Sequence, residues 1–319
     1  MNMKNKRIKY LIHLSALLLC YIVSAQQDAQ YTQYMYNMSV LNPAYATDNT
    51  DAINLGGLYR AQWVGSVGGP TTGTFFGHAA FGKNVEGGLS IIHDQIGDVV
   101  KETNVFADFA YVLPLNESHK LSFGLKAGAT FFSTNFNGFV YSDVLPDQAF
   151  ANNLSRTLPN VGVGTYYFGE NYYLGFSAPN LLNSKHLEKQ DGIIRTGSEE
   201  VHYFLTGGYV FTLNDKLKLK PAFMTKAVSG APVSIDVTTN VLINNVFEAG
   251  IGYRLGDSMS GLVNFRVTPN LRVGYAYDYT LSNLGRFNSG SHEIMLLFDL
   301  SKSGNNNTTN GYDKSPRFF

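Results

Sequence analysis

Residues 271–281 read Leu271, Arg272, Val273, Gly274, Tyr275, Ala276, Tyr277, Asp278, Tyr279, Thr280 and Leu281. Every odd-numbered residue in this stretch is apolar or aromatic, and every even-numbered residue is small or charged. Successive side chains of a β-strand point to opposite faces, so this order predicts a strand with one apolar and one polar face. The length matches the roughly 9–11 residues that a tilted transmembrane strand needs.

The same alternation recurs along the chain, clearly in residues 121–131 and 233–241. Weaker examples begin near Ile53, Gly73, Val85, Val99, Leu158, Tyr172, Val201, Lys216, Val246, Met259 and His292. We therefore predict an all-β protein, a transmembrane antiparallel β-barrel of about 14 strands over residues 52–300.

The connections between the expected strands alternate in length. Short ones follow even-numbered strands, as at residues 82–84 and 244–245, and the longest, near residues 135–157 and 180–200, follow odd-numbered strands. Bacterial barrels have short periplasmic turns and longer outer loops. We therefore expect an outer-membrane location with both termini in the periplasm.

Three segments fall outside the expected barrel. Residues 1–25 combine Lys4, Lys6, Arg7 and Lys9 with an apolar run and a small-residue ending, which is typical of a secretory signal peptide. Residues 26–51 are rich in Gln, Tyr and Asn and have no clear period, so they form either a periplasmic segment or a plug in the lumen. Residues 301–319 form a polar tail.

Composition excludes several classes of function. Only 15% of the residues are charged and the formal net charge is zero, so no basic surface for nucleic acid is expected. The lone cysteine, Cys20, lies within the signal peptide, which leaves the mature chain without disulfides or a thiolate metal site. The 20 Tyr and 22 Phe suit the interfacial girdles of a barrel.

The sequence shows no recognisable catalytic set, so we expect no enzyme and no cofactor. Gly162, Gly164 and Gly169 resemble a phosphate loop but lie within a strand pattern with no following helix, and the first two are better interpreted as small residues on a barrel wall. Ser291 with His292, and His78 with His93, are two possible catalytic pairs, but wall or rim positions are favoured for all four residues.

Ionisable residues on the polar faces of the strands are the candidate site residues. They either pair across the lumen and brace it or line a path for solutes, and we favour bracing. Trp63 is a candidate girdle residue or partner-binding anchor. The run Asp48, Asn49, Thr50 and Asp51 lacks the ligand spacing of a calcium loop and is interpreted as a solvated turn. The candidate lumen-facing charges are Arg60, Lys126, Asp236, Glu248, Arg254, Arg266, Arg272 and Asp278.

Several stretches resemble one known family. The mature start, residues 27–45 with Asn42, Pro43 and Ala44, resembles the opening of the PorP/SprF family of outer-membrane proteins, associated with type IX secretion and gliding motility in the Bacteroidetes. Residues 59–65, 121–128, 217–232, 272–280, 291–295 and 315–319 also resemble family stretches. The resemblance implies an accessory barrel that serves a secreted surface protein such as an adhesin, and association with periplasmic parts of the secretion and motility complex.

Two further hypotheses of function remain beside the accessory barrel. A diffusion channel or specific porin would need an open lumen, and about 14 strands lies between small filled barrels and sixteen-strand porins. An outer-membrane enzyme would need a nucleophile, a His and an acid at one rim. The position of residues 26–51 would separate the accessory barrel from the channel.

Overall fold

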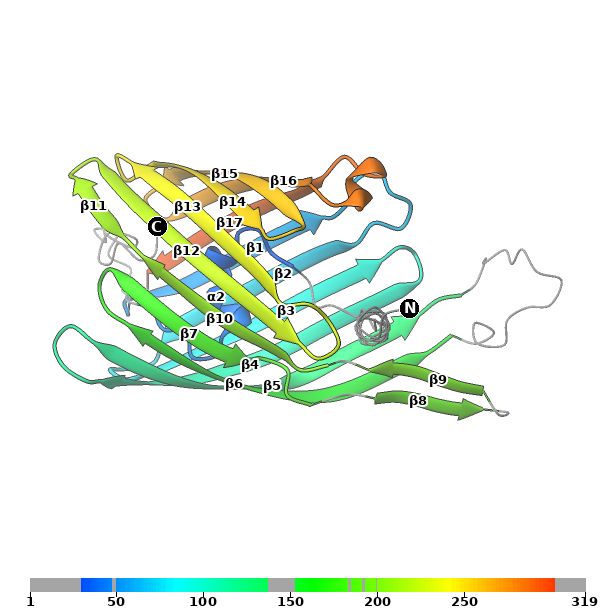
Figure 1. Ribbon diagram of the computed structural model, residues 1–319. Coiled ribbons are helices and arrows are strands. Elements are labelled where there is room, and N and C mark those ends of the chain that lie inside the picture. The colour runs from blue at the N-terminus through cyan, green and yellow to red at the C-terminus, as the bar shows by residue number, and fades with distance from the viewer. Residues whose placement is uncertain are drawn as a thin grey trace, which may run out of the picture.

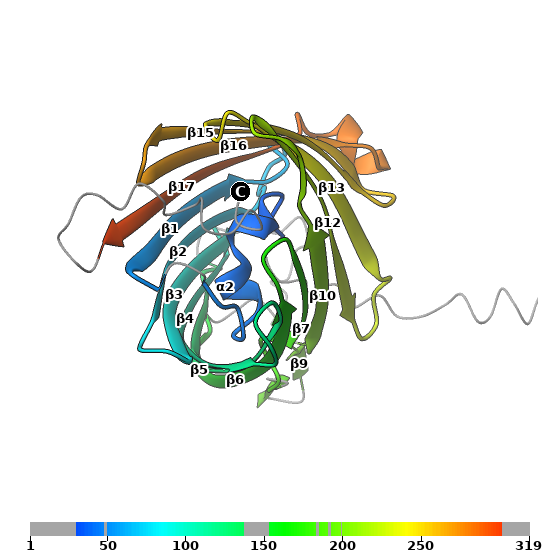
Figure 2. The same ribbon diagram turned by 90° about the vertical axis from the view of Figure 1, so that its left-hand side faces the viewer.

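The computed structural model describes residues 30–47, 50–136, 153–182, 185–190, 193–198 and 200–301. The expected signal peptide and the polar tail beyond Ser301 lie outside these residues. Apart from one separate hairpin, the strands of the described residues form one antiparallel sheet that closes on itself into a barrel, with a short N-terminal segment inside it (Figures 1 and 2).

Fourteen strands close the barrel, which confirms the fold predicted from the alternation. Segments β10 and β11 flank Val210 and both pair with β12, so they count as one strand. The first and last strands pair along their length, from Ala52 opposite Ser301 to Ala61 opposite His292. The strands of the barrel are β1 (Ala52–Ala61), β2 (Thr71–Ala80), β3 (Val85–Ile96), β4 (Val100–Pro114), β5 (Lys120–Thr134), β6 (Ser155–Phe168), β7 (Tyr172–Ala178), β10 (His202–Tyr209), β11 (Phe211–Asn214), β12 (Leu217–Val228), β13 (Ser234–Ile243), β14 (Phe247–Arg254), β15 (Ser258–Thr268), β16 (Leu271–Thr280) and β17 (Ser291–Ser301).

The two faces of each strand carry different residues because one meets lipid and the other the lumen. In β16, Tyr275 and Tyr279 are exposed on the outer surface, whereas Arg272 and Asp278 are buried inside. Among the described residues, no helix is long and apolar enough to cross a membrane.

The connections differ between the two ends of the barrel. Tight turns such as residues 81–84 and 244–246 lie at the same end as Ala52 and Ser301. The opposite end carries residues 62–70 and residues 281–290, which include the 3-10 helix η3 (Asn283–Arg286). It also carries a separate hairpin, β8 (Lys185–Gln190) with β9 (Ile193–Ser198), where the sequence predicted only a long loop.

The N-terminal segment lies in the lumen, and its two short helices are η1 (Tyr34–Tyr36) and α2 (Met38–Leu41). Viewed along the barrel, α2 sits within the ring of strands (Figure 2). All residues from Tyr31 to Ala44 are buried. The main apolar core is therefore the contact between this segment and inward side chains such as Phe76, Tyr166 and Met295.

Candidate functional site in the barrel lumen

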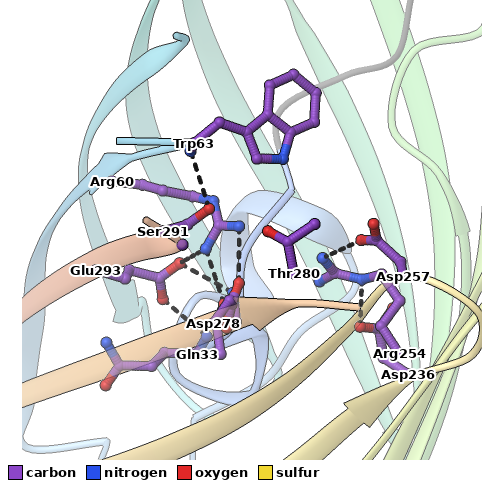
Figure 3. Close-up of polar contacts among 12 residues, drawn as sticks. Gln33, Arg60, Trp63, Asp236, Arg254, Asp257, Asp278, Thr280, Ser291 and Glu293 are labelled. Carbon is purple, nitrogen blue, oxygen red and sulfur yellow. Dashed lines mark hydrogen bonds and ion pairs between the residues drawn. The ribbon is translucent and has the colours of Figure 1, made fainter. Parts of the chain in front are cut away.

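The first anchor of the N-terminal segment is a cluster of charges from β1, β16 and β17. Arg60 lies between two carboxylates, 2.8 Å from Asp278 and 3.2 Å from Glu293 (Figure 3). The backbone N–H groups of Thr32 and Gln33 donate to Glu293 at 2.9 and 2.7 Å, and the Thr32 hydroxyl donates to Asp278 at 2.6 Å. Because all these groups are buried, the cluster ties the segment to the seam where the barrel closes.

The second anchor is Tyr36, which reaches strands β13, β14 and β16. Its hydroxyl donates to Glu248, which also accepts from Asn240 at 2.5 Å and pairs with Arg272 at 3.2 Å. Lys220 lies 5.5 Å from the centre of the Tyr36 ring. Burial raises the pKa of the Tyr36 hydroxyl well above its ordinary value and the Glu248 charge raises it further, so the hydroxyl stays protonated and remains a donor.

Two further anchors come from strands β2, β3, β4 and β5. Lys126 pairs with Asp108 at 3.3 Å and donates to the backbone carbonyl of Val40 at 3.0 Å. Glu86 accepts from the backbone N–H of Thr47 at 2.7 Å and contacts the His78 ring at 2.6 Å. The Lys126–Asp108 pair balances charge within the lumen, and Lys126 still has a proton to donate to the segment. Glu86 likewise keeps an oxygen that accepts from the segment.

The Asn42, Pro43 and Ala44 motif packs against a wall from which side chains are missing. A Cβ on Gly164 would collide with the Asn42 amide oxygen, and a Cβ on Gly124 would collide with the backbone of Pro43 and Ala44. Asn42 also donates to the backbone carbonyl of Thr165 at 3.0 Å. Gly124 and Gly164 therefore admit the motif, as expected of small residues on a barrel wall.

Taken together, the anchors surround the segment, because they come from β1 to β7 and from β13, β14, β16 and β17. A cavity of about 100 Å³ is left beside it, lined by Tyr31, Val40, Ile92 and Phe106 among others. Ligand pockets usually measure roughly 300–1,000 Å³, so this space suits structural packing better than a substrate.

The structure buries seven of the eight candidate charges inside the barrel and leaves Arg266 half-buried on β15. Arg60, Lys126, Glu248, Arg272 and Asp278 take part in the anchors described above. Asp236 pairs instead with Arg254 at 2.7 Å, and Arg254 also contacts Asp257 at 3.3 Å near the rim (Figure 3).

Trp63 lies half-buried just beyond β1, at the end of the barrel that carries the longer connections. Its backbone N–H donates to the Ser291 hydroxyl at 3.1 Å, and its φ of 52° is rare for a bulky residue. Of the predicted solvated turn at residues 48–51, Thr50 and Asp51 are described, and Asp48 and Asn49 lie outside the described residues.

In each of the two possible catalytic pairs, the barrel wall separates one residue from the other. Ser291 is buried in the lumen, whereas the next residue, His292, bonds Tyr275 at 2.7 Å on the outer face. His78 is likewise buried with Glu86, whereas His93 is exposed and bonds Thr103 at 2.8 Å. Neither pair can therefore act on one substrate. Among the described residues, no group of three or more His, Cys, Asp or Glu side chains could hold a metal ion.

Several residues of the anchors were not among the candidates from the sequence, including three carboxylates and a tyrosine. Glu293, Asp108 and Glu86 lie on the inward faces of their strands, so the alternation that selected the other charges would also have found them. Tyr36 could not have been found in this way, because its segment has no period.

Comparison with known proteins places the chain in a family. The CymD monoaromatic hydrocarbon channel has a TM-score of 0.51 at 12% identity, over 83% of this chain and 92% of that one. The toluene transporter TodX of Pseudomonas putida (TM-score 0.47, 10% identity, 83% and 93% covered) and Omp33 of Acinetobacter baumannii (0.44, 12%, 79% and 99%) are more distant. At these identities the likeness to CymD shows an outer-membrane barrel fold alone. No curated protein sequence matches the chain. Residues 23–298 match the family described as type IX secretion system membrane protein PorP/SprF, and the chain belongs to that family.

Proposed function

We propose that this chain is an accessory barrel of the type IX secretion and gliding machinery, which supports export or surface attachment of a specific large partner protein such as an adhesin. Membership of a secretion-system membrane protein family supports a role in secretion rather than in catalysis. The observation that carries the proposal is the N-terminal segment, buried from Tyr31 to Ala44 across the lumen.

A filled lumen argues against free diffusion of solutes. Passage would require the segment to leave and expose Arg60, Asp278, Glu293, Glu248 and Lys126 together. The ion pairs themselves lie within the barrel wall, and the segment is held by hydrogen bonds to their charged groups. Such bonds typically contribute about 1.5–3 kcal/mol each, so several anchors together hold the segment in place. The barrel then acts through its outer surfaces, which is the behaviour of an interaction protein.

The orientation follows from the connections. The tight turns share one end with Ala52 and Ser301, and short turns are periplasmic in bacterial barrels. We therefore place both ends of the barrel chain in the periplasm, next to the periplasmic components of the machine. The longer connections face outward, where residues 62–70 and 281–290 are held together by backbone hydrogen bonds between Val64 and Gly290 (2.8 Å) and between Ser289 and Val64 (2.7 Å).

The test is an affinity pull-down of the tagged protein from crosslinked cells of the native organism, with mass spectrometry of the captured proteins. We expect a large secreted surface protein or periplasmic motor components. Recovery of barrel-assembly factors alone would contradict the proposal.

Two matched variants locate the contact. Phe287 is 72% exposed in an outer connection, and Leu115 is 51% exposed in a turn at the opposite end. Phe287→Ser should reduce capture of a surface partner, whereas Leu115→Ser should leave that capture unchanged. Equal loss in both variants would contradict contact through the outer loops.

A further inference from the structure

An apolar groove of about 630 Å³ runs over β1 to β4 on the outside of the barrel, away from the lumen. Its floor consists of four small residues at outward-facing positions of β2, β3 and β4. The residues paired with them on the adjacent strands also face outward. Ala79 lies opposite Gly87, Gly77 opposite Leu89, and Leu89 opposite Ala107 in the pairing of β2, β3 and β4. The floor residues are Gly77, Ala79, Gly87 and Ala107.

Large apolar side chains form the walls of the groove. Phe75 and Ile91 are 56% and 47% exposed on its border, and Leu89, which is 67% exposed, projects between the floor residues Gly77 and Ala107. A Cβ on Gly87 would come within 2.9 Å of the Phe81 ring, and one on Gly77 within 3.1 Å of Leu55. Because Gly77 and Gly87 have no side chains, Phe81 and Leu55 can lie over the floor and form the sides of the groove.

The groove is continuous with the lipid-facing band of the barrel, and this continuity identifies the chemistry of its occupant. In hydrocarbon there is no hydrophobic driving force for association, and contact depends on van der Waals packing. A concave apolar surface offers an extended chain more contacts than the convex wall elsewhere. The volume lies within the roughly 300–1,000 Å³ of ligand pockets.

The end of the groove offers charge for a headgroup. Phe81 is followed by the turn that joins β2 and β3, where Lys83 is exposed, and Asp51 is exposed just before β1 at the same end. The positive charge of Lys83 and the negative charge of Asp51 suit a zwitterionic headgroup that carries a phosphate and an ammonium. This end is periplasmic in the orientation proposed above, on which the choice of leaflet rests.

We propose that the groove over β1 to β4 is a binding site for an acyl chain of phosphatidylethanolamine from the periplasmic leaflet, with the phosphate beside Lys83. The probe is phosphatidylethanolamine with a photoreactive diazirine in one acyl chain, incorporated with the full-length mature protein into nanodiscs. Mass spectrometry then maps the crosslinked residues.

We expect adducts enriched several-fold on residues 75–91 over the outward residues of β13 to β15. Ala107→Leu adds bulk to the exposed floor and should remove most of this enrichment. Ala249→Leu makes the same change on the outer face of β14, far from the groove, and should preserve it. Retained heat-modifiable mobility in gels checks that both variants fold.

Three results would overturn the site. Adducts spread evenly around the barrel would show ordinary annular lipid, and equal effects of the two leucine variants would show that the groove is not responsible. A second probe carries the diazirine next to the headgroup. If enrichment persists in Lys83→Gln and the adducts of this second probe lie at the opposite end of the groove, the lipid does not come from the periplasmic leaflet. None of these outcomes depends on the secretion partner, so a failed pull-down and a failed lipid site are distinguishable.

Discussion

Replacement of Glu293 by alanine tests the anchoring of the N-terminal segment most severely. Glu293 is fully buried and accepts from the backbone N–H groups of Thr32 and Gln33 and from Arg60. Removal of one partner of a buried ion pair costs about 3–5 kcal/mol. Arg60 keeps Asp278 at 2.8 Å and the Thr32 hydroxyl at 2.8 Å, so the lower end of this range applies.

The expected result is local release of the segment with an intact barrel. A loss of about 3 kcal/mol corresponds to roughly 10²-fold faster exchange of the Thr32 and Gln33 amides, at tenfold per ~1.4 kcal/mol. Hydrogen-exchange mass spectrometry of peptides covering residues 30–37 measures this rate. Glu293→Gln keeps an acceptor without its charge and should give a smaller increase.

The control is Glu117→Gln, an exposed carboxylate in the turn after β4, which should leave the rate unchanged. Unchanged protection of residues 32 and 33 in Glu293→Ala would refute the anchoring role of this carboxylate.

Three further substitutions test other parts of the structure. Gly124→Ala places a Cβ against the backbone of Pro43 and Ala44 and should weaken docking of the N-terminal segment by about 1–3 kcal/mol. The expected result is faster amide hydrogen exchange in residues 38–47. Gly261→Ala, where a Cβ meets open space, should have no effect. Tyr36→Phe removes the donor to buried Glu248 and should cost about 1–3 kcal/mol, measured by exchange of residues 34–40; unchanged exchange would contradict this bond's contribution. Ile251→Lys puts a charge on the lipid face of β14 and should cost about 2–4 kcal/mol in urea unfolding from micelles, and an unfolding midpoint equal to that of Ile251→Leu would show that Ile251 does not face lipid.

The strands could be predicted from the sequence because each one separates two media. The alternation in residues 271–281 sorts its side chains between lipid and lumen, and β16 begins at Leu271 as expected. The same alternation predicts that the candidate charges face the lumen, but it does not predict which residues they pair with. The hairpin of β8 and β9 lies outside the main sheet and was missed, because a strand beyond the membrane needs no such alternation.

The pairing of the charges and the place of the N-terminal segment could not be predicted. Arg60 meets Asp278 and Glu293 only because the first strand pairs with the last, a contact that depends on closure of the barrel. Residues 31–44 have no period because they face a wall on all sides, so both polar and apolar residues are buried there. The sequence therefore left two alternatives for this segment, a plug or a periplasmic extension.

Planar-bilayer conductance of the purified protein tests the closed-lumen account most directly. The chain with its N-terminal segment should be electrically silent, and a matched chain lacking residues 30–47 should conduct if it retains the heat-modifiable mobility of a folded barrel. Steady ohmic conductance of the intact chain, equal to that of the deleted one, would contradict the account and favour a diffusion channel.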